Sequence, residues 1–282
     1  MYMLLENKNA IVYGAGGSLG GAVARALAAA GAKVFVTGYR PDSIERTAAA
    51  IRTAGGVAET AIVDGFDKKA IEEHLAGVVQ KAGAVDISFN AVEVRVVQNT
   101  ALTNISVEDF VTPIARTMET RFLTAIAAAK LMMKQGSGVI LSLTATPGGI
   151  GYPYTGGFAP ACCAVESFSR NLASELGVYG IRVVNIRSGG SPDSRVFKEA
   201  IESNPVDMGP MIKMLEDDTM LKKMPLMADI ANVAVFLASD LAGMVTGVTV
   251  DVTGGTTAAL NYRASAQSDT VQKRTGPVSK PG

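Results

Sequence analysis

The sequence predicts an α/β domain in which a doubly wound parallel sheet of about seven strands is covered by helices on both faces. Short apolar segments alternate along the chain with longer amphipathic segments, which is the pattern of repeated βα units. The chain has 282 residues, 48% of them hydrophobic, enough for one large core. A glycine cluster follows the first apolar segment, where the first strand of such a sheet turns into a helix.

Each expected strand is a short apolar run. The expected strands are 9–13, 33–37, 57–63, 86–90, 139–143, 181–187 and 248–252. Between them lie segments of helical length that combine Ala-rich and charged positions. The expected helices are 18–30, 41–54, 67–81, 106–134, 159–178 and 229–238.

Composition excludes several classes of function. The formal net charge is zero, whereas nucleic-acid-binding proteins usually carry a basic excess, so we expect no nucleic-acid partner. No apolar run reaches the roughly 20 residues that span a bilayer, so we expect no membrane partner. The only histidine, His74, cannot form a zinc site, and we expect it on a solvated helix surface. The adjacent Cys162 and Cys163 do not suggest a structural disulfide, and with the short polar start of the chain they favour a cytoplasmic setting.

The glycine cluster is a candidate phosphate-binding turn. Glycines let the backbone turn sharply and lie close to a pyrophosphate, while the start of the next helix presents free N–H groups to it. The spacing is not G-x-G-x-x-G, because Leu19 stands where the last glycine would be. The expected contacts at this turn are Gly14, Gly16, Ser18, Leu19 and Gly20.

The residues after the second expected strand favour NADP(H) over NAD(H). An acidic residue there would hold the ribose 2′-hydroxyl and repel a 2′-phosphate. The sequence instead has Tyr39 and Arg40, and an arginine makes charge-assisted hydrogen bonds to a 2′-phosphate. We therefore expect one dinucleotide-binding domain over 1–262, followed by a polar tail over 263–282 that lacks hydrophobic periodicity.

Together these features resemble the short-chain dehydrogenase/reductase family, with its Rossmann-like fold. The family's TGxxxGxG motif falls on 13–20, its adenine-contacting Asp on Asp64, and the first Asn of its NNAG motif on Asn90. The text CAVESFSRNLASELGVYGIRVVNIRSGG over 163–190 is similar to the family's AAVE…LAxELGxxGIRVNxIxPG. The resemblance implies that the segment starting at Gly189, with Ser191, contacts the nicotinamide amide.

The resemblance fails at the catalytic residues. The family uses a Tyr as proton donor and a Lys that lowers the tyrosine pKa and binds the nicotinamide ribose. Its YxxxK pattern falls on Phe158 and Cys162, which have neither a hydroxyl nor an amine. The family's Ser falls on Ala145, beside Thr144 and Thr146, and its helix Asn falls near Thr117. The tentative catalytic replacements are Tyr154, Tyr152 and Thr144.

Three functions stay open. The protein can be a reductase with a relocated acid, acting on a carbonyl, enone or imine. It can be a sensor or binding module that holds the dinucleotide without turnover. It can also be a lyase or isomerase that uses Cys162, Thr144 or a tyrosine, although Cys162 would need a lowered pKa.

Segment 190–227 is expected to cover the ligand crevice as a lid. It contains several methionines, which adapt to irregular apolar shapes and so favour an apolar small-molecule substrate. These are Met208, Met211, Met214, Met220, Met224 and Met227. The resemblance further implies a homodimer or homotetramer assembled through the helices over 106–134 and 159–178.

Overall fold

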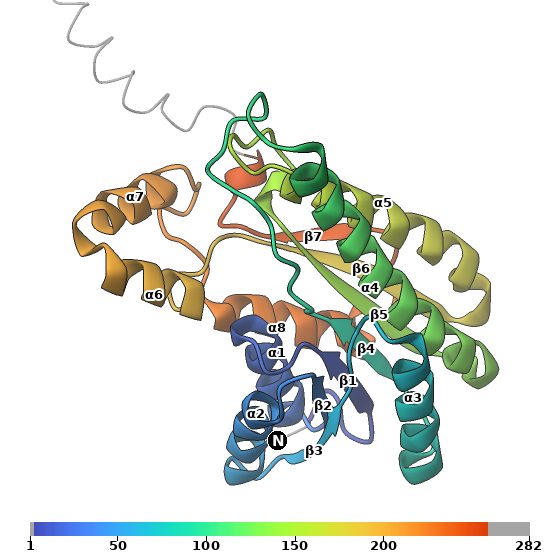
Figure 1. Cartoon of the computed structure of the whole chain (residues 1–282). Coiled ribbons are helices and arrows are strands. Elements are labelled where there is room, and N and C mark those ends of the chain that lie inside the picture. Colours follow the sequence, from blue (N-terminus) through green and yellow to red (C-terminus); the bar gives the residue numbers. More distant parts are fainter. Residues whose placement is uncertain (1–2, 259–282) are drawn as a thin grey trace, which may run out of the picture.

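A computed structural model describes residues 3–258, apart from the side chains of 205–207, so the expected tail lies outside the described residues. Its central feature is one parallel sheet in the order β3-β2-β1-β4-β5-β6-β7 (Figure 1). The strands are β1 (Asn9–Tyr13), β2 (Lys33–Gly38), β3 (Val57–Ile62), β4 (Ile87–Asn90), β5 (Gly138–Ala145), β6 (Ile181–Ser188) and β7 (Thr249–Val252). The predicted doubly wound α/β fold is therefore confirmed.

Helices cover both faces of the sheet. The helices are α1 (Ser18–Ala29), α2 (Pro41–Thr53), α3 (Lys68–Ala82), α4 (Val107–Gln135), α5 (Phe158–Leu176), α6 (Arg195–Ser203), α7 (Pro205–Asp217) and α8 (Met227–Ala238). One face packs on α1, α2 and α8, and the other on α3, α4 and α5 (Figure 1). Strand β1 is buried on both faces, which explains the apolar residues after Asn9: Ala10 and Val12 belong to the first core, whereas Ile11 and Tyr13 belong to the second.

The long helix α4 is bounded by signals in its own sequence. Ser106 precedes it and its Oγ accepts a hydrogen bond of 3.0 Å from the N–H of Asp109. Gly136 ends it in a left-handed conformation, with φ of 70°. The buried stripe of this helix contains small residues such as Ala125 and Ala128 and also, unexpectedly, Arg121.

Boundaries differ from the sequence prediction mainly near the ligand crevice. Strand β5 runs three residues longer than the predicted 139–143, because Thr144 and Ala145 pair with Arg187 and Ser188 of β6. The expected lid over 190–227 contains two helices, α6 and α7, which project away from the sheet beyond its edge (Figure 1).

The expectation that His74 lies on a solvated surface is wrong. Its ring is half-buried and packs edge-on against Phe35, with ring centroids 6.1 Å apart. Burial, and then the positive charge of Lys81, lower the pKa of His74 to about 4. The adjacent Glu72 and Glu73 suggested a fully polar face, but His74 stands one residue before Leu75, on the side that faces the core.

This burial predicts a pH-dependent stability. Above pH 6.5 His74 is neutral in both states, whereas between the unfolded value of 6.5 and the folded value of about 4 only the unfolded chain takes up the proton. Lowering the pH through this window should therefore lower the free energy of unfolding by about 2 kcal/mol more in the wild type than in His74→Phe. Urea denaturation of both proteins at about pH 7.5 and about pH 4.5 measures this difference. Parallel losses in the two proteins would contradict it.

Candidate active site

The glycine turn between β1 and α1 has no room for side chains at two positions. Gly14 has φ of 73°, and a Cβ there would lie 2.6 Å from the carbonyl oxygen of Ala91. A Cβ on Gly20 would lie 2.4 Å from the carbonyl oxygen of Gly14. The turn is held in place by the N–H of Ala15, which donates to the carbonyl of Thr37 at 3.0 Å. Only glycines at both positions keep this backbone, as the sequence predicted.

The start of α1 faces this turn with its amides. The residue before it, Gly17, has no side chain to cap the helix, so the first N–H groups and the positive end of the helix dipole are available to an anion. Ser18 is already engaged, because its Oγ accepts a hydrogen bond of 3.1 Å from the N–H of Arg195 at the start of α6. The expected contact Leu19 packs partly into the core.

The end of β2 carries an exposed cation beside the glycine turn. Arg40 lies with its guanidinium carbon 5.2 Å from the ring centre of Tyr39, which is 67% exposed. Helix α2 begins directly after Arg40, and its Ser43 lies so close to Gly16 that a Cβ there would meet the Ser43 hydroxyl at 2.2 Å. The expected adenine contact Asp64 is exposed after β3, where its carboxylate accepts the N–H of Phe66 at 3.0 Å.

Asn90 ends β4, opposite Tyr13 of β1, and holds together several groups at this end of the sheet. Its amide donates to Thr124 Oγ1 at 2.8 Å, and its Oδ1 accepts from the N–H of Val92 at 2.8 Å. The same Oδ1 accepts a hydrogen bond from Arg121, a residue of α4 that the sequence analysis missed. The missed signal is its spacing, because Arg121 stands four residues before Ala125 and thus on the buried stripe of α4.

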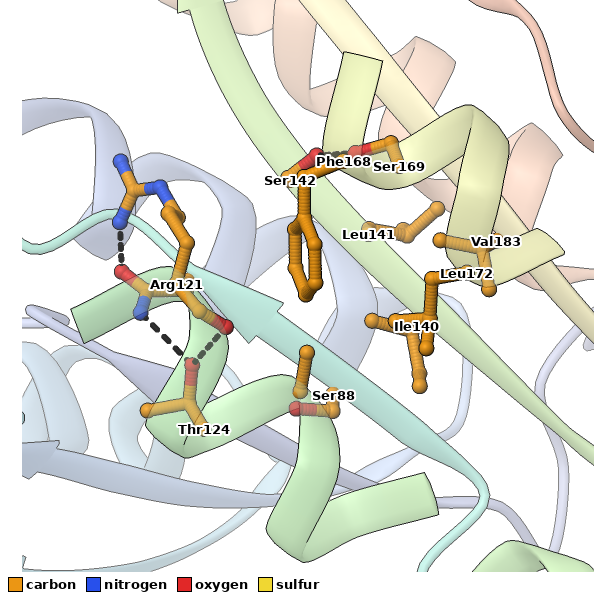
Figure 2. Close-up of a pocket in the computed structure, with 12 residues that line it drawn as sticks. Ser88, Arg121, Thr124, Ile140, Leu141, Ser142, Phe168, Ser169, Leu172 and Val183 are labelled. Carbon is orange, nitrogen blue, oxygen red and sulfur yellow. Dashed lines mark hydrogen bonds between the residues drawn. The ribbon is translucent and has the colours of Figure 1, made fainter. Parts of the chain in front are cut away.

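A small cavity of about 10 Å³ lies between β4, β5, α4 and α5, with Arg121 at its edge (Figure 2). Its lining includes Ser142, Ile140 and Phe168, and it has room for a single water at most. The guanidinium of Arg121 points away from the other labelled lining residues (Figure 2). It donates a hydrogen bond to Asn90 at the end of β4.

The positions of the usual catalytic pair lie on the first turns of α5. Phe158 begins the helix, and Cys162 follows one turn later with only 3% of its surface exposed. Burial raises the pKa of the Cys162 thiol to about 11, even though a backbone hydrogen bond at Ala145 acts in the opposite direction. A thiol of this kind stays protonated near neutral pH, so the lowered pKa that a nucleophilic Cys162 would need is not found.

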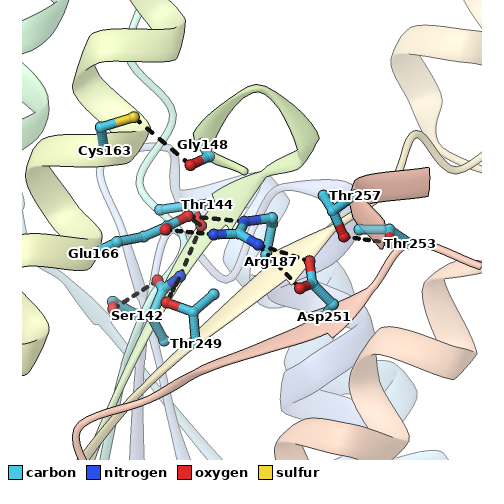
Figure 3. A network of polar contacts seen from close by, with 11 residues as sticks. Ser142, Thr144, Gly148, Cys163, Glu166, Arg187, Thr249, Asp251, Thr253 and Thr257 are labelled. Atoms are coloured by element: carbon cyan, nitrogen blue, oxygen red, sulfur yellow. Dashed lines mark hydrogen bonds and ion pairs between the residues drawn. The ribbon is translucent and has the colours of Figure 1, made fainter. Parts of the chain in front are cut away.

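A buried network of charges, which the sequence analysis also missed, joins α5, β5, β6 and β7 (Figure 3). The guanidinium of Arg187 makes two contacts with the Glu166 carboxylate and two with Asp251, the latter at 2.9 and 3.0 Å. Burial opposes the charge, but the hydrogen bonds and charges of Glu166 and Asp251 outweigh it and raise the pKa of Arg187. The missed signal is that Glu166 and Arg187 interrupt otherwise apolar stretches of the sequence.

Thr144 belongs to this network. Its hydroxyl donates to Glu166 at 3.0 Å and accepts a hydrogen bond from the amide of Asn185 at 2.7 Å. Only 4% of the surface of Thr144 is exposed, and its hydroxyl hydrogen lies in the hydrogen bond to the Glu166 carboxylate. Among the three tentative catalytic residues, Thr144 is therefore the one whose hydroxyl already donates a hydrogen bond to a charged protein group.

The other two tentative residues lie on the loop between β5 and α5. Tyr152 is 38% exposed, and burial together with the negative charge of Asp218 raises its phenol pKa. Asp218 follows α7, so this tyrosine faces the expected lid. Tyr154 is 57% exposed and has a φ of 61°, an uncommon conformation for a residue other than glycine.

The loop after β6 brings a buried hydroxyl to the site. The N–H of Gly189 donates to the carbonyl of Val252 at 2.9 Å, which places this loop beside the end of β7. Ser191 is 7% exposed, and its Oγ has no hydrogen-bond partner among residues 3–258. A buried hydroxyl without a partner is costly, and a ligand atom would satisfy it.

Residues 3–258 contain no group of three or more His, Cys, Asp or Glu side chains that could hold a metal. None of the helices in that part of the chain is both long and apolar enough to cross a bilayer.

Comparison with known proteins agrees with this geometry. A family model described as enoyl-(acyl carrier protein) reductase matches residues 14–257. A 3alpha-hydroxysteroid dehydrogenase of Mediterraneibacter gnavus is 31% identical over 90% of this chain and 98% of its own. The crystal structure of levodione reductase superimposes with a TM-score of 0.82 at 27% identity, covering 90% of this chain and 99% of the other.

A gluconate 5-dehydrogenase from Burkholderia cenocepacia, solved with NADP and tartrate, shares the fold with a TM-score of 0.82 at 23% identity, covering 92% of this chain and 98% of the other. The family model, the relatives and the solved structures each match nearly the whole described chain, including the glycine turn. The chain belongs to the short-chain dehydrogenase/reductase family of oxidoreductases.

Proposed function

We propose that the protein is an NADP(H)-dependent oxidoreductase with a non-standard active site, which reduces an apolar carbonyl, enone or imine. The glycine turn carries this proposal, because Gly14 and Gly20 keep a tight backbone turn that a side chain at either position would distort, and such a turn lets the backbone lie close to a pyrophosphate. The uncapped start of α1 offers N–H groups to the phosphates, and the unpartnered Ser191 hydroxyl suits the nicotinamide amide. The residues present therefore fit a dinucleotide.

Arg40 is proposed to select NADP(H) by binding its 2′-phosphate, together with the first turn of α2. Arg40→Ala should weaken NADPH binding by about ten- to a hundredfold, the value of a lost charge-assisted contact, and leave NADH binding nearly unchanged. Arg46→Ala is the matched control, since Arg46 is an exposed arginine one turn further along α2. Titration calorimetry with both nucleotides measures the effect. Equal loss of NADPH and NADH affinity would contradict the role given to Arg40.

Tyr152 is proposed as the proton donor. NADPH would supply the hydride, and the acceptor atom of the substrate then needs a proton from the protein. The Tyr152 hydroxyl is protonated near neutral pH, as any phenol is, and its raised pKa makes it a weaker acid, so its place on the loop before α5, and not its pKa, supports the role of donor. Tyr154 is its alternative on the same loop, and the methionines of α7 and the following loop, including Met211, Met214 and Met220, would contact an apolar substrate.

One assay separates this function from the alternatives. Wild type, Tyr152→Phe and Phe158→Tyr/Cys162→Lys are compared for NADPH consumption with a panel of ketones, enones and imines. We expect turnover by the wild type and a loss of about a hundredfold in Tyr152→Phe, the value of one general acid. Turnover only in the double variant would support a silent dinucleotide binder, which the absence of both usual groups at 158 and 162 favours. Substrate conversion without NADPH consumption would reveal a lyase or isomerase.

A dimer or tetramer through α4 and α5 is part of the same proposal. The rings of Phe122 on α4 and Phe168 on α5 lie 6.0 Å apart, and Phe122 is 51% exposed. Val107 and Val111 on α4 are also exposed. An apolar surface of this kind suits a second copy of the chain.

A further inference from the structure

Arg121 carries a buried charge that no carboxylate compensates among the described residues. Only 7% of its surface is exposed, and one nitrogen of its guanidinium donates to Asn90 Oδ1. Its Nε is buried and lacks a hydrogen-bond partner in the described part of the chain. Burial lowers the pKa of Arg121 to about 10, so the side chain still keeps its charge at neutral pH.

The groups around this guanidinium are neutral. Asn90, Thr120 and Thr124 form hydrogen bonds with one another on the side of β4 and α4. On the side of α5 the titratable neighbour is the Cys162 thiol, which its raised pKa keeps protonated. Burying a charge among neutral neighbours lowers the stability of the free protein, because the charge loses its hydration. A ligand that binds the charged group would offset this loss.

The position of Arg121 in the sheet indicates which part of a bound dinucleotide would lie near it. Strand β4 lies beside β1 in the sheet, with Asn90 opposite Tyr13, and the chain winds in opposite directions on either side of this pair. Ligands of doubly wound sheets lie across the carboxyl ends of the strands at such a reversal. The glycine turn after β1 marks the place of the phosphates, and Arg40 marks the adenine side at β2. Arg121 therefore lies on the opposite, nicotinamide side.

We propose, on the basis of the proposed function, that Arg121 binds the hydroxyl oxygens of the ribose next to the nicotinamide, and so replaces from α4 the cation that Cys162 has removed from α5. The guanidinium reaches Asn90 at the carboxyl end of β4 from the neighbouring helix α4, one turn beyond Thr117, the position of the family's helix Asn. Its free Nε offers a donor to ribose oxygens.

The test compares two probes that share the adenine half of the cofactor. NADPH contains the nicotinamide ribose, whereas adenosine 2′,5′-bisphosphate ends before it. In Arg121→Met we expect NADPH affinity to fall by about tenfold or more and bisphosphate affinity to stay within about twofold of the wild type. Adding Cys162→Lys to Arg121→Met should restore most of the NADPH affinity, because it returns a cation to α5.

Thermal melting of the free proteins separates binding from a structural role. Methionine replaces an uncompensated buried charge by an apolar chain of similar length, so the free Arg121→Met protein should melt at or above the wild-type temperature. Asn90 Oδ1 keeps its hydrogen bond from Val92 in this variant.

A marked fall in the melting temperature would assign Arg121 to the fold and overturn the proposal. Wild-type NADPH affinity in Arg121→Met, or equal weakening of both probes, would also overturn it. Failure of the wild type to bind either probe is a different result, which refutes the dinucleotide function itself.

Discussion

Glu166→Gln should lower the free energy of unfolding by about 3 kcal/mol, the lower end of the usual cost of breaking a buried ion pair from one side, because Asp251 still compensates part of the Arg187 charge. The substitution keeps the size of the side chain but leaves the Arg187 guanidinium, of which only 12% is exposed, with Asp251 as its one remaining carboxylate. It also removes the charged acceptor of the Thr144 hydroxyl. Urea denaturation at neutral pH measures the loss.

The double variant Glu166→Leu/Arg187→Leu is the control for this prediction. Replacing both charges by apolar groups removes their desolvation cost, so the double variant should recover most of the stability lost in the single one. Asp251 is 38% exposed in its side chain and can then be solvated. A double variant as unstable as Glu166→Gln would mean that packing, and not charge compensation, sets the cost.

Gly20→Ala should reduce NADPH affinity by about a hundredfold or more, since the tight pyrophosphate turn is lost. The new Cβ would lie 2.4 Å from the carbonyl oxygen and 2.9 Å from the carbonyl carbon of Gly14, and backbone atoms can give way only if the turn itself moves. Titration calorimetry measures the affinity, and near-UV circular dichroism checks that the variant is folded.

Gly77→Ala is the matched substitution outside the site. Gly77 lies inside α3, and a Cβ there meets nothing within 4 Å in the described structure. This variant should bind NADPH as the wild type does and gain about 0.5–1 kcal/mol in stability, because alanine is the better helix former. A folded Gly20→Ala protein with unchanged NADPH affinity would refute the role of the turn.

The order of strands and helices was predictable because parallel strands buried on both faces are continuous apolar runs. The stretch NAIVY of β1 shows this, since each of its residues is buried. The end of β5 was not predictable in this way. Thr144 and Ala145 look like the start of a loop, and only pairing with Arg187 and Ser188 keeps them in the strand.

The glycine turn was predictable because its glycines are close together in sequence, between an apolar strand and a helix. At Gly20 the constraint is also local, since the backbone of Gly14 supplies the collision, whereas at Gly14 it comes from the distant Ala91. The charges of the site were not predictable, because their partners are distant in sequence. Arg187 meets Glu166 across 21 residues and Asp251 across 64, and Arg121 meets Asn90 across 31. Sequence spacing within one helix could have marked Arg121 as buried, but it could not name its neighbours.

The hydrogen bond between Ser18 and the N–H of Arg195 joins two segments separated by 177 residues. The first of them cradles the expected phosphates, and the second begins α6. If the start of α6 moves away from α1, the hydrogen bond from Arg195 to the Ser18 hydroxyl must break. A substitution of Ser18 is therefore expected to affect both the proposed phosphate site at the start of α1 and the position of α6.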